Sequence, residues 1–365
     1  MTQVPQCREG SLRGAERPEG TPHGIARNLV VRARLRRGGR VLTASLALAA
    51  GCFAVLCVSL SVGDVAIPLF DVVRALVGGG DAGSAYIVTE LRLPRAAVGL
   101  LAGAAFGMSG TIVQTLVRNP LASPDVIGIT AGASATAVIA LLGFGLSGYA
   151  ISLAALVGAL ATGALSYAFA WRRGVTGYRF VLVGIAMAAM LTSVVSYTMT
   201  RADVTSARTA LVWLTGSLNV KTWTTAQILG SLLVVLVPLA LVAARRLAAL
   251  QLGDDVARGL GVPVERARLG LLAVAVALAA VATAAVGPVA FVAFVAGPVA
   301  HRITGQVGTA LVPAALVGAL VLTASDFVAQ HAFGTALPVG VVTAIVGAPY
   351  LLWLLAVTNR VGRGG

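Results

Sequence analysis

Long apolar segments, about ten of them separated by short loops, dominate this sequence of 365 residues. A helix of about 20 apolar residues spans the hydrocarbon core of a bilayer with its backbone polar groups bonded internally. Hydrophobic residues make up 58% of the chain and charged residues only 11%, against about 25% charged in soluble domains. We therefore expect an all-α integral membrane protein. The expected spans are 41–61, 92–114, 125–143, 149–170, 179–200, 223–244, 265–285, 288–303, 308–328 and 338–358.

The net charge of +14 does not indicate a nucleic-acid partner, because the basic residues lie in the first 40 residues and in short loops. Arginine and lysine concentrate in the cytoplasmic loops of membrane proteins. This rule predicts that both termini are cytoplasmic. We expect a disordered basic tail over 1–40, a polytopic domain over 41–358 and a short cytoplasmic tail over 359–365.

Two polar clusters flank the second apolar segment. Arg92 and Arg95 precede it on the outer side, where they could anchor the helix at the interface or dock an acidic partner. Asn119 and Leu121 follow it on the inner side, in a stretch with two prolines that interrupts helical structure. Spacing alone leaves a plain turn and a gate as equal interpretations of this second cluster.

The longest cytoplasmic loop, about 247–266, mixes acidic, basic and glycine residues. A loop that only retains positive charge on one side would not need this pattern, so a docking surface for a cytoplasmic partner is favoured. The candidate docking residues are Asp254, Asp255, Arg258, Gly259, Leu260 and Gly261.

The eighth segment, 288–303, is short and follows Gly287 and Pro288, so a broken or partly re-entrant helix is expected around Phe291. Asp326 is an ionisable residue in an apolar segment, which is a candidate for function, although it lies near the outer end. Three cysteines without metal-ligand spacing predict no metal site and no cofactor. The sequence has no Walker A motif, so ATP hydrolysis would need a separate chain, and no enzymatic activity is expected.

Several ordered motifs together resemble the FecCD-type permeases of ABC importers for iron–siderophore, haem and cobalamin. The similarity is strongest to permeases for ferric siderophores such as the enterobactin type. The motifs are RLPR (92–95), SG..VQ (109–114), NPLASPDVIG (119–128), WLTGSL (213–218), LGDDVARGLGV (252–262), GPVAFVAF (287–294) and LPVGVVTAIVGAPYLLWLL (337–355).

This resemblance implies a type II importer permease fold with ten helices per subunit, in the bacterial cell membrane. It implies a second permease subunit, with a heterodimer favoured, a cytoplasmic ATPase dimer, an extracytoplasmic binding protein and a ferric siderophore as cargo. By similarity, Arg92 and Arg95 dock the binding protein, and residues 254–261 couple to the ATPase. The implied cytoplasmic gate consists of Asn119, Leu121, Thr176 and Gly177.

The sequence departs from the family pattern where Gln330 stands in place of an arginine, so a third docking arginine is not expected. Cobalamin and haem stay open as alternative cargoes. A secondary carrier driven by an ion gradient is the alternative from another class, but it would need more intramembrane ionisable residues than Asp326.

Overall fold

The computed structural model describes residues 22–171, 177–305 and 308–361, and over these ranges the chain is helical without strands. The long and intermediate helices are α1 (Pro22–Ser61), α4 (Leu93–Val117), α5 (Ile129–Val138), α6 (Tyr149–Ala170), α7 (Gly177–Arg201), α8 (Val204–Leu214), α9 (Trp223–Gln251), α11 (Val264–Val286), α12 (Val292–Thr304), α13 (Leu311–His331) and α14 (Val339–Val361). The short ones are α2 (Leu69–Leu76), α3 (Ala82–Tyr86), α10 (Asp254–Gly259) and the π-helical η1 (Ile87–Arg92) and η2 (Ile139–Gly143).

Seven helices in the described residues are long and apolar enough to cross a membrane. Three shorter helices occupy the remaining expected spans. They are the apolar helices Ile129–Gly143 and Val339–Leu354 and the 13-residue α12. Each expected segment thus contains a helix, and the prediction of an all-α membrane fold is confirmed.

The chain divides into two units, Met1–Arg40 and Val41–Gly365, and α1 crosses the boundary. Residues 22–40 of the expected disordered tail are helical, whereas residues 1–21 lie outside the described part. Arginine and alanine are good helix formers, so the sequence RARLRR can continue a transmembrane helix past its apolar part. Our expectation did not consider this local propensity.

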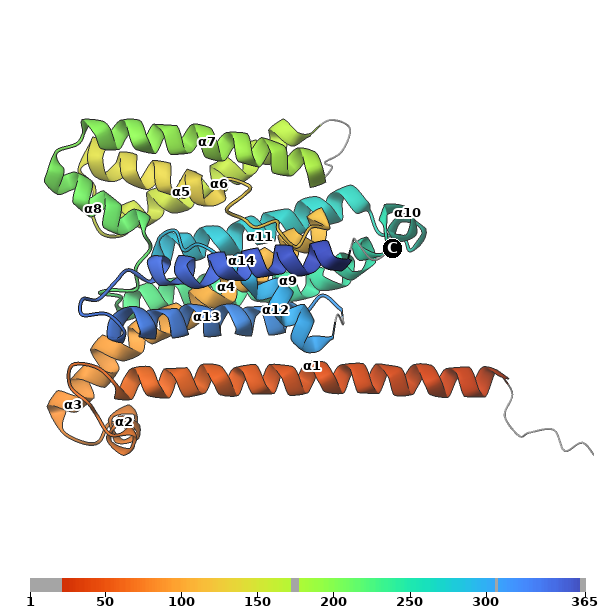
Figure 1. The fold of residues 1–365 in the computed structure, drawn as a ribbon, viewed down its shortest axis with the longest axis horizontal. Coiled ribbons are helices and arrows are strands. Elements are labelled where there is room, and N and C mark those ends of the chain that lie inside the picture. Colours follow the sequence, from red (N-terminus) through yellow and green to blue (C-terminus); the bar gives the residue numbers. More distant parts are fainter. Residues whose placement is uncertain (1–21, 172–176, 306–307, 362–365) are drawn as a thin grey trace, which may run out of the picture. The chain divides into compact units, whose positions relative to one another are not determined.

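Helix α4 is the central element of the second unit, and it packs against α9, α11, α12 and α13 (Figure 1). Its glycines allow this close packing. Gly103 and Gly107 lie against the backbone of Gly318 and Ala314 in α13, and Gly110 lies against Ala293 in α12. Small residues let membrane helices approach until backbones touch. The core is therefore built mainly on backbone proximity, in a chain that is only 5% aromatic.

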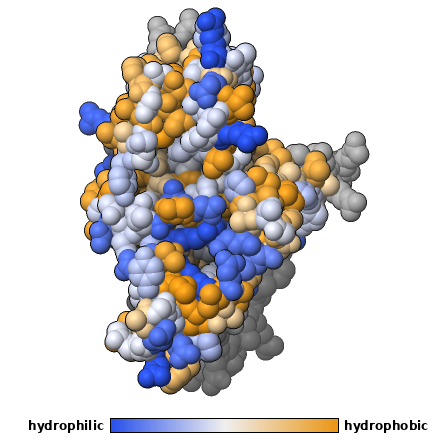
Figure 2. Space-filling view, turned by 90° about the vertical axis from the view of Figure 1, so that its left-hand side faces the viewer, coloured by the Kyte–Doolittle hydropathy of each residue, from blue (hydrophilic) through white to orange (hydrophobic). Residues whose placement is uncertain are grey.

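The loops of the second unit gather at two ends of its helices. Helices α2, α3 and α8 lie at one end, and α10 lies at the other (Figure 1). Figure 2 looks onto the first end, where hydrophilic residues gather around a hollow between apolar surfaces. Arginines concentrate at the end with α10: Arg258 lies in this helix, and Arg245, Arg246, Arg266 and Arg268 flank it. The positive-inside rule therefore predicts that this end is cytoplasmic.

The expected helix break is present. Helix α11 ends at Gly287 with a φ of 81°, and α12 begins after Phe291, whose φ is 68°. The intervening backbone lies against the loop after α8, where a Cβ on Gly216 would overlap the carbonyl oxygen of Pro288. The amide of Ser217 in this loop donates to the carbonyl of Val286, the last residue of α11, at 2.8 Å. Pro288 belongs to this non-helical stretch, so α12 is a short helix, as the Gly and Pro residues predicted.

Candidate functional site

Arg95 and Asp326 form an ion pair between α4 and α13, at the end of the helices opposite to α10 (Figure 1). The guanidinium donates twice to the carboxylate, from Nε to Oδ2 at 2.9 Å and from Nη2 to Oδ1 at 2.8 Å. Gln330 adds a third hydrogen bond, from Nε2 to Oδ2 at 2.9 Å. The side chains of Arg95 and Asp326 are only 18% and 9% exposed. Bidentate pairs of this kind are strong and geometrically specific, so Arg95 has a structural role within the chain.

Arg92 is also bonded within the chain. Its Nη1 donates to the carbonyl of Leu60 at 2.7 Å, and its Nη2 donates to the carbonyl of Val65 at 2.6 Å. These bonds fasten the turn after α1 to the start of α4. The guanidinium leaves little room beside Gly63, where a Cβ would approach it to 2.5 Å. Docking of an acidic partner by Arg92 and Arg95 stays a prediction, and it must compete with these bonds.

We expect Asp326→Asn to destabilise the protein, because it leaves the Arg95 charge without its carboxylate in a largely buried position. Removing one partner of a buried pair costs about 3–5 kcal/mol, and the partial exposure of Arg95 places the effect at the lower end. The measurement is the thermal unfolding midpoint of the purified protein in detergent. The swapped pair Arg95→Asp with Asp326→Arg should recover part of the loss, and an unchanged midpoint in Asp326→Asn would refute the structural role.

The turn that follows α4 begins with strained backbone. Arg118 ends the helix with a φ of 56°, in the left-handed region that non-glycine residues rarely adopt. The side chain of Asn119 then accepts a hydrogen bond from the amide of Leu121 at 2.9 Å. Such Asx turns stabilise a compact reversal of the chain. The predicted gate residues Asn119 and Leu121 are therefore held in one defined turn.

Gly177, the first residue of α7, lies against the end of α4. A Cβ at this position would stand 3.1 Å from the Cα of Val117. The structure thus brings Gly177 next to the turn of Asn119 and Leu121, as expected for parts of one gate. Thr176, the fourth predicted gate residue, lies outside the described residues. The role of these residues in gating stays a prediction.

Asp254, the first residue of α10, is bonded to α11 and to the residue that follows α4. Arg118 donates from Nη2 to its Oδ1 at 3.1 Å, and also to the carbonyl of Leu250 in α9 at 3.0 Å. Arg268 of α11 donates to both carboxylate oxygens, at 3.2 Å and 3.0 Å. The position of α10 is therefore tied directly to the residue that begins the candidate gate turn.

The opposite face of α10 is free for a partner. The carboxylate of Asp255 is 99% exposed, and it pairs only with Arg258 one turn later, at 2.7 Å. Val256 and Leu260 are exposed beside this pair, while Ala257 is fully buried and anchors the helix. Gly259 ends α10, and Gly261 continues the turn with a φ of 79°. The predicted coupling residues thus divide into an anchor, Asp254, and an outward-facing surface.

No group of three or more His, Cys, Asp or Glu side chains that could hold a metal occurs among the described residues. The residues of the helix break contact other helices. Phe291 lies against Gly347 of α14, where a Cβ would clash with the ring.

Comparison with known proteins identifies the family to which this fold belongs. The model of the FecCD transport family matches residues 51–357. The chain belongs to the FecCD transport family. The similarity predicted from the motifs is therefore confirmed, and it covers nearly all of the second unit.

Curated relatives of this FecCD protein match over almost their whole lengths. The ferric enterobactin transport system permease protein FepG of Escherichia coli (strain K12) is 41% identical, with 88% of this chain and 98% of the relative covered. The achromobactin transport system permease protein CbrC of Dickeya dadantii (strain 3937) is 38% identical, with 87% and 91% covered. The Fe(3+) dicitrate transport system permease protein FecD of E. coli (strain K12) is 38% identical, with 86% and 97% covered.

A solved structure also shares the fold of this FecCD protein. It shows a metal-chelate type ABC transporter in an inward-facing conformation, with a TM-score of 0.76 and 23% sequence identity. The match covers 87% of this chain and 99% of the other. The expected permease fold is confirmed by this similarity.

Sequence reasoning identified most of these residues but not their partners. It missed the bonds of Asp254 to Arg118 and Arg268, and the bond of Gln330 to Asp326. Arg118 is 136 positions from Asp254, and Arg95 is 231 positions from Asp326, so no local pattern connects these two pairs. For Arg95 and Asp326 the available signal was charge, because they are opposite ionisable residues in apolar segments and each needs a partner. Gln330 and Asp326 are four positions apart on one helix, so their bond did have a local signal.

Proposed function

We propose that this chain is the permease subunit of an ATP-driven ABC importer that moves a ferric siderophore complex into the cytoplasm by alternating access. The similarity to FepG, CbrC and FecD over nearly their whole lengths carries this proposal, because their names specify ferric enterobactin, achromobactin and ferric dicitrate transport. Both termini lie in the cytoplasm of a bacterial cell in this proposal, in agreement with the distribution of arginine.

The cytoplasmic partner in this proposal is an ATPase dimer that binds the outward-facing surface of α10. Asp255, Arg258, Val256 and Leu260 offer charged and apolar contacts on one exposed helix. Movement of α10 reaches the gate turn through Asp254 and Arg118. Rigid connections of this type let closure of an ATPase pair rock the helices of a transporter.

The outer partner is a binding protein that delivers the chelate to the end where α2, α3 and α8 lie. A second permease subunit completes the pathway, and a different chain is favoured over a second copy. Arg92 would contribute to docking through its positive charge, because its bonds within the chain are to carbonyl oxygens. Arg95 would have to exchange the carboxylate of Asp326 for one of the binding protein.

Uptake of radioactive iron by a deletion strain and its complemented partner tests the proposal. A panel of ferric siderophores is compared with labelled cobalamin and haem. We expect the deletion strain to lose uptake of one ferric siderophore alone, and the gene to restore it. This uptake should stop on ATP depletion and persist after collapse of the proton gradient. If the deletion abolished uptake of cobalamin or haem alone, that compound would be the cargo. Dependence of uptake on the proton gradient would refute the ABC mechanism.

A further inference from the structure

A long groove runs between α6 and α9 on a floor formed by α11, which packs against both helices. Its volume is about 560 Å³. Apolar side chains form most of its lining. Leu153, Ile228 and Leu232 are exposed on the outside of the bundle and Leu156 is half-buried, whereas Leu229 and Val281 are buried. An open apolar groove of this length in a membrane-spanning helix bundle suits a hydrocarbon chain.

Polar groups gather where the groove reaches the loop before α9. Lys221 lines the groove there, together with Tyr149, Thr222 and Thr225. The hydroxyl of Tyr149 lies 3.3 Å from that of Thr222, which lies 3.5 Å from that of Thr225. No acidic residue lines the groove. This end of the groove, its mouth, therefore presents one cation and several hydroxyls, a combination that binds an anion.

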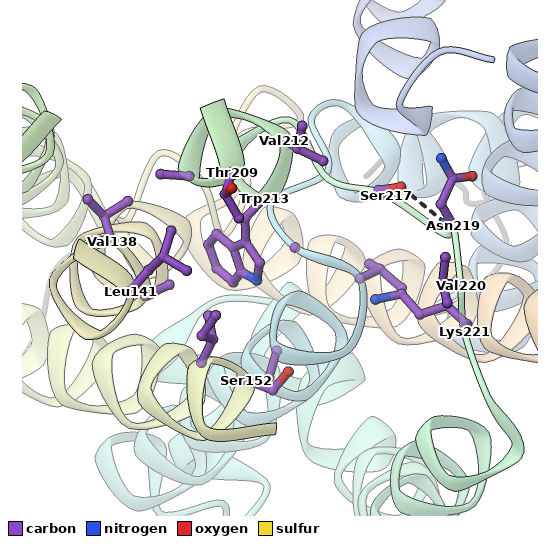
Figure 3. Close-up of a pocket in the computed structure, with 16 residues that line it drawn as sticks. Val138, Leu141, Ser152, Thr209, Val212, Trp213, Ser217, Asn219, Val220 and Lys221 are labelled. Atoms are coloured by element: carbon purple, nitrogen blue, oxygen red, sulfur yellow. Dashed lines mark hydrogen bonds between the residues drawn. The ribbon is translucent and has the colours of Figure 1, made fainter. Parts of the chain in front are cut away.

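Lys221 is the only lysine of the chain, and no carboxylate of the described residues lies within ion-pair distance of its amine. It also lines an adjoining cavity of about 320 Å³. Figure 3 shows its amine pointing into that cavity, toward Trp213. Burial lowers the pKa of the Lys221 amine, and the neighbouring Tyr149 raises it to a smaller extent. A negatively charged ligand would offset the cost of removing this ammonium group from water.

We propose that the groove between α6, α9 and α11 is a phospholipid site, with an acyl chain along its apolar walls and the phosphodiester at Lys221, Tyr149, Thr222 and Thr225. The charge of the mouth and the apolar length of the groove match the two halves of this ligand. The long stem of a lysine can follow the apolar surface while its amine reaches the headgroup level. This site is independent of the cargo and of the ATPase, so it extends the proposed function rather than depending on it.

Lipid retention by the transporter, purified as a complex in mild detergent, gives the first test. Native mass spectrometry should find one phospholipid bound per permease chain. Lys221→Gln removes the cation, and Leu232→Trp fills the apolar part of the groove; both should reduce retention. Loss of one charge-assisted hydrogen bond corresponds to about a tenfold lower affinity. Matched controls are Arg208→Gln, an exposed cation at the same end, and Leu239→Trp, an exposed leucine on α9 that does not line the groove.

The single lysine permits a second measurement on the unmodified complex. An amine-reactive reagent labels Lys221, and peptide mapping separates this site from the N-terminal amine. Labelling should be slow in nanodiscs of phosphatidylglycerol or phosphatidylcholine, and fast in phosphate-free glycolipid or in detergent after the complex has been delipidated. Inorganic phosphate added to the detergent sample distinguishes a simple anion site, which it would protect, from a lipid site, which it would not.

Three outcomes would overturn the proposal: equal retention in the groove variants and their controls, equal labelling in all lipids, or protection by inorganic phosphate alone. Labelling in delipidated detergent can also be compared with and without the second permease subunit. If Lys221 is protected only when that subunit is present, the groove belongs to a subunit interface instead. Thermal unfolding of Lys221→Gln and Leu232→Trp in the same detergent shows that they are folded, so that lost retention is read as lost binding.

Discussion

Gly107→Ala is expected to prevent α4 from packing against α13, and to leave little folded protein. The added methyl group would overlap the carbonyl oxygen of Ala314, which belongs to a backbone that cannot rotate away. The two helices would have to separate along their shared length. Overpacking of a core costs about 1–3 kcal/mol and occasionally more, and overlap with a helix backbone places this variant at the upper end. The measurement is the yield of monodisperse protein and its thermal unfolding midpoint.

Gly270→Ala is the matched control for this variant. Gly270 also lies inside a helix, α11, but no atom stands within 4 Å of the position of an added Cβ. Alanine there should stabilise the protein by about 0.5–1 kcal/mol, because glycine loses more conformational freedom on folding. The same substitution is thus expected to have opposite signs at the two sites. A Gly107→Ala protein as stable as the wild type would contradict the close approach of α4 and α13.

Asp254→Ala is expected to separate ATP hydrolysis from transport. The substitution removes the carboxylate that holds Arg118 and Arg268 together, while Asp255, Val256 and Leu260 keep the outward-facing surface of α10. Bonds to charged groups contribute about 1.5–3 kcal/mol each, and partial exposure of Asp254 reduces this amount. The ATPase should still bind, and hydrolysis should continue, but uptake per ATP should fall by about tenfold, the effect of 1.4 kcal/mol on an equilibrium.

Reconstituted transporter in liposomes allows both rates to be measured together. Asp255→Ala serves as the control, because its carboxylate contacts only Arg258 on the same helix. This control should weaken ATPase binding slightly and leave the ratio of uptake to hydrolysis unchanged. If the Asp254→Ala transporter keeps a normal ratio, the connection from α10 to the gate turn does not transmit the movement of the ATPase.

The helices were predictable because a membrane span must satisfy its own backbone and must be apolar, so each one has a local signal. This held even for the short α12, where Gly287 and Pro288 indicated the break. The helical extension of α1 before residue 41 was not predicted, because its basic sequence lacks an apolar period and contains Gly38 and Gly39, which are poor helix formers. The small helices α2, α3 and α8 lie outside the spans and have no comparable apolar signal.

The candidate site was only half predictable. Asp254, Asp255 and Arg258 were recognised as a group because they lie together in the sequence, and α10 does form there. Which side of α10 faces the protein was not predictable, because it depends on Arg118 and Arg268 from other helices. Arg92 and Arg95 suggested a surface for a partner, but both are bonded within the chain. Their bonding partners come from the turn after α1 and from α13, which only the tertiary structure brings together.

The ion pair of Arg95 with Asp326 has a consequence for biosynthesis. The two residues are 231 positions apart, so Arg95 leaves the ribosome long before its partner is made. At about 5–20 residues per second, this interval is roughly 10–50 seconds. During that time α4 also lacks α12 and α13, whose backbones later cover its glycines. Nascent α4 must therefore be sheltered by the insertion machinery or held at the membrane interface until the last third of the chain arrives.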